Sequence, residues 1–124
     1  MFITSIHDTQ SFTATDGTEI SELLHPHLFK GSYKLPYSLA HATLKEHQKS
    51  TPHRLKTSTE IYIILQGKGI VTQDNEEKKV HKDDIIVIPP GTIQSIKNIG
   101  DRPLSFLCLV SPPWDKNDEE LIKS

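Results

Sequence analysis

Two side chains in the segment TPHRLKTSTEIYIILQGKG, residues 51–69, are of the types that bind metal ions. They are His53 and Glu60. An imidazole nitrogen and a carboxylate oxygen bind a divalent ion when they converge on one point at ~2.0–2.2 Å. Leu55, two residues after His53, has no donor atom. The pair predicts either a metal centre or a buried hydrogen bond between His53 and Glu60, because a carboxylate inside a protein needs a partner.

Two further residues are candidate ligands. Gln94 offers an amide oxygen, which suits hard cations, or else it holds a small molecule within a polar network. In the segment SLAHATL, residues 38–44, the alternation of a β-strand places His41 on the face opposite to Ala40 and Ala42. If the face of His41 lines the interior, His41 supplies an additional metal ligand. Otherwise it is a surface histidine.

Tyr62 adds a group that can transfer a proton. It follows Glu60 by two residues, so both side chains point to the same face of a strand. Glu60 would raise the basicity of His53, and Tyr62 would serve as the acid. These residues predict metal-free acid–base catalysis as an alternative to a metal centre. In the other interpretation, Tyr62 is an aromatic core residue with its hydroxyl at the rim of the cavity.

The elements that must position these side chains are short. Apolar, often β-branched runs are separated by Gly, Pro, Asn and Asp, which is typical of an all-β sandwich or barrel. The tail from Asp115 to Ser124 differs in composition and predicts a short helical or disordered segment. The predicted strands are Phe2–Ile6, Thr18–Leu24, Tyr37–Leu44, Glu60–Leu65, Gly69–Thr72, Lys78–His81, Ile85–Ile88, Ile93–Lys97 and Leu104–Val110.

Length and composition exclude several classes of protein. A chain of 124 residues predicts a single domain, residues 1–124. A formal charge of −2 gives no basic field for nucleic acid or an anionic membrane. The apolar runs are too short to span a bilayer, and no signal peptide is evident. The one cysteine, Cys108, is predicted to be a small buried residue and not part of a disulfide framework. We therefore expect a cytoplasmic protein.

The spacing of the residues above resembles the two sequence motifs of small single-domain cupins. His53, Glu60 and Gly67 match the first motif, in which a glycine precedes H-x-H, a glutamate and a second glycine. Pro89, Gly91 and Asn98 match the second motif, which has the form G-x5-P-x-G-x2-H-x3-N. The resemblance covers a barrel core at about residues 38–110.

Four positions depart from these motifs. His47 and Asp83 stand where each motif begins with glycine, and Leu55 and Gln94 stand where the family has metal-binding histidines. The chain therefore keeps His53 and Glu60 from a usual set of three histidines and one glutamate. Metal binding would then depend on His53 and Glu60 with help from His41 or Gln94.

The resemblance implies a cupin-type double-stranded β-helix, or jelly-roll barrel, that binds a small molecule in its interior. A bound ion would be iron, manganese, nickel or zinc, and the reactions of such cupins include oxygenation, decarboxylation and isomerisation. Two alternatives remain at this point, a metal-free binding protein without turnover and a metal-free acid–base catalyst like the sugar epimerases of the superfamily. The resemblance also implies a homodimer, in which residues 31–36 and the N-terminal strands reach the partner.

Overall fold

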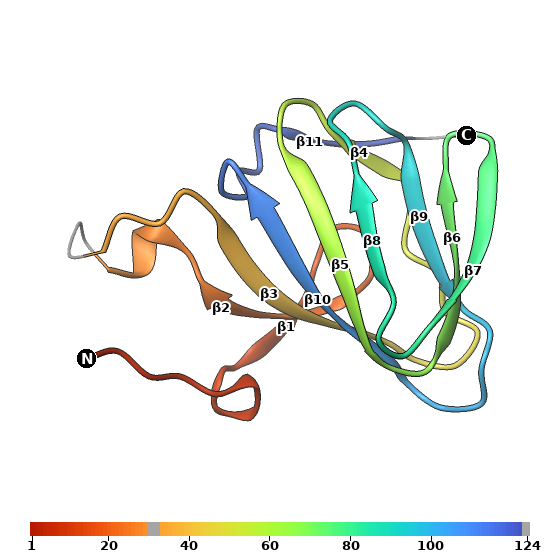
Figure 1. The fold of residues 1–124 in the computed structure, drawn as a ribbon, viewed down its shortest axis with the longest axis horizontal. Helices are drawn as coiled ribbons and strands as arrows, with labels where there is room; N and C mark the ends of the chain where they lie inside the picture. The colour runs from red at the N-terminus through yellow and green to blue at the C-terminus, as the bar shows by residue number, and fades with distance from the viewer. Residues whose placement is uncertain (30–32, 123–124) are drawn as a thin grey trace.

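The computed structural model describes residues 1–29 and 33–122, and short strands form nearly all of its regular structure (Figure 1). Two short 3-10 helices, η1 (Ile6–Asp8) and η2 (Pro26–Leu28), lie in the N-terminal part. The strands are β1 (Ser11–Thr13), β2 (Glu19–Leu24), β3 (Ser38–Leu44), β4 (His53–Leu55), β5 (Thr59–Gln66), β6 (Lys68–Gln73), β7 (Glu76–His81), β8 (Ile85–Ile88), β9 (Gln94–Asn98), β10 (Leu104–Ser111) and β11 (Glu119–Leu121).

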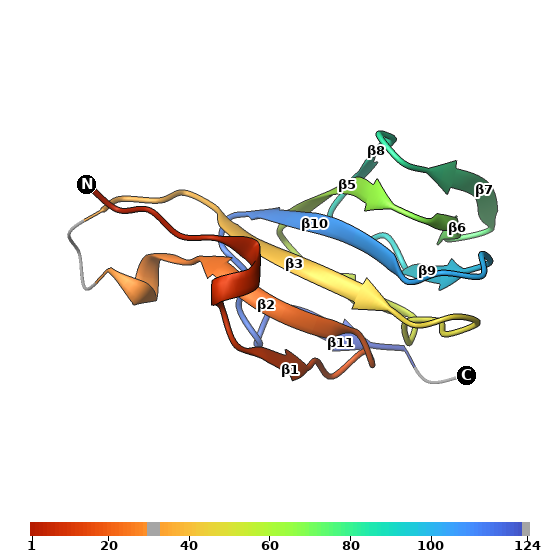
Figure 2. The ribbon, with the colours of Figure 1, turned by 90° about the horizontal axis from the view of Figure 1, so that it is seen from below.

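These strands form two antiparallel sheets. The six-stranded sheet has the order β1-β2-β3-β10-β5-β8, and the five-stranded sheet has the order β11-β4-β9-β6-β7. Strand β10 lies between β3 and β5, so strands that are distant in sequence become neighbours. Figure 2 shows β10 running along the middle of its sheet beside β3. The prediction of an all-β jelly-roll barrel is therefore confirmed.

Two predictions about the elements need correction, and a third is not tested. No strand forms at Phe2–Ile6, where the chain is irregular and then turns through η1, and β1 follows instead. The C-terminal tail is not helical, because β11 pairs with β4 in the register Glu119↔Leu55 and Leu121↔His53. Part of the segment 31–36, which was predicted to reach a partner subunit, lies outside the described residues.

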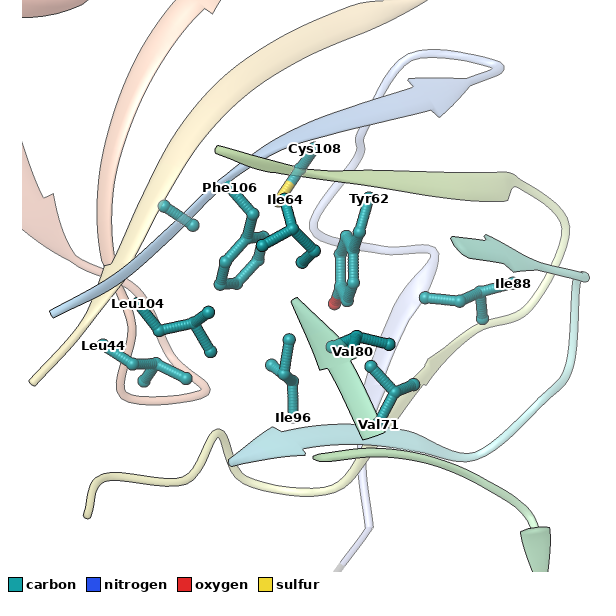
Figure 3. Packing of buried hydrophobic residues seen from close by; sticks show 11 residues of the cluster. Leu44, Tyr62, Ile64, Val71, Val80, Ile88, Ile96, Leu104, Phe106 and Cys108 are labelled. Atoms are coloured by element: carbon teal, nitrogen blue, oxygen red, sulfur yellow. The ribbon is translucent and has the colours of Figure 1, made fainter. Parts of the chain in front are cut away.

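The core lies between the two sheets, because the strands of the six-stranded sheet alternate between apolar residues that face inward and residues on the outer face. Figure 3 shows the inward side chains meeting one another, among them Ile64, Phe106, Ile96 and Val71. The rings of Tyr62 and Phe106 pack with their centroids 4.8 Å apart. Cys108 belongs to this cluster, as predicted.

Sharp turns between the strands fix where the core strands begin and end. Gly67, between β5 and β6, has φ +96°, and a Cβ atom there would lie 2.9 Å from the backbone of Leu104. Only glycine fits that conformation and that space. His47 and Asp83, which replace the leading glycines of the two motifs, also have left-handed φ angles of 64° and 76°. The turns keep the glycine conformation although the glycines are absent.

Candidate functional site

A cavity of about 220 Å³ opens between the two sheets, beside the end of the core cluster that contains Tyr62 and Cys108. Its walls come from β1 to β5, from β10 and from the C-terminal segment, as well as from the loop between β1 and β2. Leu55 contributes to the wall, so the position of a missing histidine is filled by an apolar side chain. This volume suits a small metabolite, since drug-sized ligands occupy pockets of about 300–1,000 Å³.

His53 enters the cavity from β4 and is 3% exposed. Its Nδ1 lies 2.8 Å from the carbonyl oxygen of Thr51. A carbonyl only accepts hydrogen bonds, so Nδ1 carries the proton and the lone pair of Nε2 is free. A backbone partner of this kind holds a metal-binding histidine in one tautomer and orientation. In this tautomer His53 keeps one ring nitrogen, Nε2, that could serve as a ligand.

Two carboxylates lie beside His53. One ligand atom each from Asp16, His53 and Glu119 lies within 4.8 Å of the others. Asp16 comes from the loop between β1 and β2, and Glu119 comes from β11. Burial raises the pKa of Glu119, and the nearby His53 opposes that shift. The three groups offer one nitrogen and two oxygen donors to a cation.

Local hydrogen bonds orient both carboxylates. Oδ1 of Asp16 accepts hydrogen bonds from the backbone N–H and the hydroxyl of Thr18, at 3.1 and 2.7 Å. The other oxygen, Oδ2, lies 3.8 Å from Nδ1 of His53. Oε2 of Glu119 accepts a hydrogen bond from Nε1 of Trp114 at 3.1 Å. Each carboxylate is thus held through one oxygen and has a second oxygen for another partner.

Glu60 lies deeper in the same cavity and belongs to a separate polar chain. The hydroxyl of Tyr62 donates to Oε1 of Gln94 at 2.7 Å, and Nε2 of Gln94 donates to Oε1 of Glu60 at 2.8 Å. All three side chains are buried. Burial raises the pKa of Glu60 from 4.5 to about 7, against the opposing charge of His53. Glu60 therefore gains or loses a proton near neutral pH.

The predicted site residues fall into three groups. His53, Glu60 and Tyr62 line the cavity. Gln94 lies beneath it, and its amide oxygen is occupied by Tyr62, so the expectation that this oxygen binds a metal is not supported. His41 does not join them. The inward face of β3 carries Ala40 and Ala42, which line the cavity, and His41 points to the other face.

The structure does not place His41 with the other candidate ligands, for a physical reason. In the alternation of β3 the two alanines pack into the interior, which leaves His41 on the outer face of the sheet. Partial burial and the nearby charge of His7 lower the pKa of His41. Its neighbours across the sheet are Ser21 on β2 and Leu107 on β10.

Sequence reasoning missed Asp16 and Glu119, because both lie outside the two motifs. The turn T-D-G-T at residues 15–18 was the available signal for Asp16, since an aspartate there bonds to the backbone two residues later. Glu119 had no comparable signal. Its place in the cavity depends on the pairing of β11 with β4, which joins segments more than 60 residues apart.

Side-chain contacts fasten the C-terminal segment over the cavity. Asp118 accepts hydrogen bonds from the backbone N–H groups of Thr57 and Ser58 and from the hydroxyl of Thr57. Arg54 donates two hydrogen bonds to Glu120, at 3.1 and 3.2 Å. These contacts lie on both sides of Glu119 in the sequence, so they determine where its carboxylate points.

None of the helices in the described part of the chain has the length and apolarity needed to cross a bilayer.

Comparisons with known proteins agree with this architecture. Residues 40–110 match the family model described as the cupin domain. An uncharacterised protein of Methanocaldococcus jannaschii, MJ1618, is 44% identical over 112 residues, which cover 90% of this chain and 87% of that protein.

Two solved structures share the fold at low sequence identity. The nucleoside dehydratase Pac13 of Streptomyces has a TM-score of 0.77 at 14% identity, over 99% of this chain and 92% of that one. A predicted oxalate decarboxylase of Thermotoga maritima has a TM-score of 0.76 at 20% identity, over 89% of this chain and 98% of that one. The matched family model, the relative and the two-sheet barrel together show that the chain belongs to the cupin family.

Proposed function

We propose that this cupin barrel holds a divalent cation at Asp16, His53 and Glu119, and binds a small metabolite in the adjoining cavity. The convergence of these three groups within 4.8 Å carries the proposal. The set differs from the one expected from the motifs, because two carboxylates replace Glu60, His41 and Gln94 as the partners of His53.

The donor set fits a divalent first-row ion. Imidazole suits zinc, iron and nickel, and carboxylates suit manganese as well. The two carboxylates carry two negative charges, and the imidazole of His53 can offset at most one of them. A dication would neutralise the negative charge that is left in this partly buried site. When bound, such an ion supplies Lewis acidity and a coordination position for a ligand.

Glu60 is the residue that we propose to move a proton on the metabolite. One of its oxygens is held by Gln94, which leaves Oε2 as the oxygen available to a ligand. A pKa of about 7 lets this carboxyl group act as a general acid or a general base near neutral pH. The hydroxyl of Tyr62 donates a hydrogen bond to Gln94, so we assign Tyr62 to positioning Glu60 through that amide.

Elemental analysis tests the metal site. The protein is purified without a metal-binding tag, incubated with iron, manganese, nickel or zinc, and desalted. We expect a near-stoichiometric ion in the unmodified chain and in Glu60→Gln. Asp16→Asn and Glu119→Gln should each weaken binding by at least about tenfold, as loss of a ligand does. Glu77→Gln is the matched control, since Glu77 is an exposed residue of β7 and does not line the cavity.

Two results would count against this assignment. Loss of the ion in Glu60→Gln with retention in Glu119→Gln would show that Glu60, the glutamate of the cupin motif, binds the ion and that Glu119 does not. Absence of an ion in the unmodified chain after all four incubations would overturn the metal proposal.

The buried chain Tyr62–Gln94–Glu60 favours a second candidate function, metal-free acid–base catalysis. Its three members satisfy one another without an ion, and Glu60 keeps an oxygen for a substrate. A chelator distinguishes the candidates, because only the metal-dependent protein loses thermal stability on its addition. A metal-free binding protein would also resist the chelator but would show no turnover. The cytoplasmic location and the homodimer stay predictions.

A further inference from the structure

The titratable groups that line the cavity are biased to one sign of charge. Among the described residues, its walls contain four carboxyl groups and one imidazole, and neither lysine nor arginine. The chain has 14 lysines and arginines, so this bias does not come from a shortage of basic residues. The carboxyl groups belong to Asp16, Glu22, Glu60 and Glu119.

Three of these carboxyl groups already have partners, or would have them once the proposed cation is bound. Glu22 forms an ion pair with His27 at 2.8 Å. Asp16 and Glu119 would neutralise the dication together with His53. Glu60 remains, because its hydrogen bond with Gln94 comes from a neutral amide and adds no charge.

Glu60 is built to face a ligand. The residue is 8% exposed, and Oε1 accepts the hydrogen bond from Gln94. Among the described residues, Oε2 of Glu60 accepts no hydrogen bond. It is nevertheless not a fully buried atom, because Arg54 Nε is the fully buried side-chain polar atom that lacks a partner there. Oε2 is therefore exposed to the cavity that the Glu60 side chain lines. A cavity-facing carboxylate oxygen without a donor favours a ligand that carries a hydrogen-bond donor, and a charged N–H donor binds it more strongly than a neutral one.

The remaining walls are mostly apolar and aromatic, with hydroxyl groups from Ser38 and three threonines. Phe106 and Tyr62 form the inner part together with Val110, and Phe12 and Trp114 lie at the more exposed parts, with 53% and 39% exposure. Aromatic faces attract cations and repel anions. Without a bound cation, a carboxylate or phosphate would meet both Glu60 and these ring faces, and neither lysine nor arginine lines the cavity to bind it.

From this arrangement we infer that the organic ligand of the cavity is a small amine with a short apolar body, whose ammonium group binds Oε2 of Glu60. The inference rests on the proposed function only in taking this cavity as the binding site. It requires no metal ion, because the charge of Glu60 remains whether or not a cation is bound by Asp16, His53 and Glu119.

Matched probes test the charge preference on the full chain. Benzylamine, benzyl alcohol and benzoate share a ring and differ in one polar group. Binding is measured by isothermal titration calorimetry at pH 8, in metal-loaded and in chelator-treated protein. We expect benzylamine to bind at least tenfold more tightly than benzyl alcohol in both preparations, and benzoate to bind more weakly than either in the chelator-treated protein. Equal or tighter binding of benzoate in the chelator-treated protein, or no binding of benzylamine, would overturn the inference.

Variants test whether Glu60 is responsible. Glu60→Gln should remove the preference for benzylamine over benzyl alcohol and keep the binding of the alcohol. Glu22→Gln is the matched control and should keep the preference, because Glu22 is paired with His27. Circular dichroism checks the fold, and the probe comparison in the unmodified chain stands without either variant. Unchanged amine preference in Glu60→Gln would refute the assignment.

The metal content of each preparation separates this inference from the proposed function. A chain that binds benzylamine but no metal ion would overturn the proposed cation site and leave the amine site in place. A chain that holds an ion, and that still prefers benzoate after the chelator has removed the ion, would do the reverse.

Discussion

Burial of the Glu60 carboxylate lowers the free energy of unfolding at neutral and high pH. Its pKa rises from 4.5 to about 7, chiefly because burial disfavours the carboxylate. The native state therefore keeps a proton between these pH values that the unfolded chain has released. The free energy of unfolding falls as pH rises through this window, and the penalty is complete above pH 7.

Replacement of this carboxyl group should therefore stabilise the chelator-treated protein at high pH. Glu60→Gln should raise the free energy of unfolding at pH 8 by as much as about 3 kcal/mol, one pKa unit being about 1.4 kcal/mol. Below pH 4.5 the effect should be small, since Glu60 is protonated in both states. Urea denaturation at pH 4 and pH 8 measures the difference. An equal effect at both pH values would show that the carboxylate charge is not the cause.

Single residues in left-handed turns also affect the free energy of unfolding. His47 has φ 64° at a position where the cupin motif has glycine. A side chain there costs about 1–2 kcal/mol, from which the greater freedom of glycine in the unfolded chain subtracts about 0.5–1 kcal/mol. We expect His47→Gly to raise the free energy of unfolding by up to about 1 kcal/mol. The control Glu46→Gly, in the same turn but without a left-handed φ angle, should lower it.

At the scale of elements, the C-terminal segment is the part of the candidate site that is hardest to predict from the sequence. Its last strand, β11, has three residues and is held by its pairing with β4 and by the contacts of Asp118 and Arg54. Asp118 joins the segment to the turn between β4 and β5 through three hydrogen bonds with Thr57 and Ser58. These hydrogen bonds hold Glu119 and Trp114 against the cavity.

Loss of the Asp118 carboxylate should release this segment. Asp118→Ala removes its charge-assisted hydrogen bonds and should lower the free energy of unfolding by about 1–3 kcal/mol. The single tryptophan, Trp114, reports the change, and its emission should shift to longer wavelength as the ring becomes more exposed. Asp115→Ala is the control, since the Asp115 carboxylate accepts a hydrogen bond from the nearby backbone N–H of Asn117 and, among the described residues, none from the turn between β4 and β5. An unchanged emission maximum in Asp118→Ala would contradict the proposed anchor.

These elements also mark how far the sequence could predict the site. The long strands β5 and β10 alternate between inward and outward residues, so periodicity predicted that Glu60 and Tyr62 share one face, and the cupin resemblance implied that this face is the inner one. The three-residue strands β1, β4 and β11 are too short to carry a period, and long-range pairing determines them. Asp16 and Glu119 come from the segments beside β1 and within β11, so the sequence could not place them next to His53.

At the scale of the whole molecule, the outer face of the six-stranded sheet is apolar across three adjacent strands. The register aligns Ile61 of β5 with Leu109 of β10 and Val87 of β8, and aligns Ile63 with Leu107 and Ile85 in the next row. Ile85 and Val87 are 66% and 56% exposed. These two rows contain no charged side chain, which is unusual for a surface that faces water.

A second copy of the chain is the partner that we expect on this face. Homodimer interfaces are more apolar than other surfaces, and a two-fold axis would place the same rows of both copies against each other. The unmodified protein should then sediment at twice the mass of the 14.0 kDa chain. Val87→Lys combined with Ile63→Lys should give a monomer that keeps the fold, because both side chains point away from the core. Lys97→Glu, on an exposed position of β9, should leave the mass unchanged. A monomeric unmodified chain at about 100 μM, or a dimer that survives both lysines, would refute this interface, since a stable one buries about 800 Å² on each partner and could not accommodate four inserted charges.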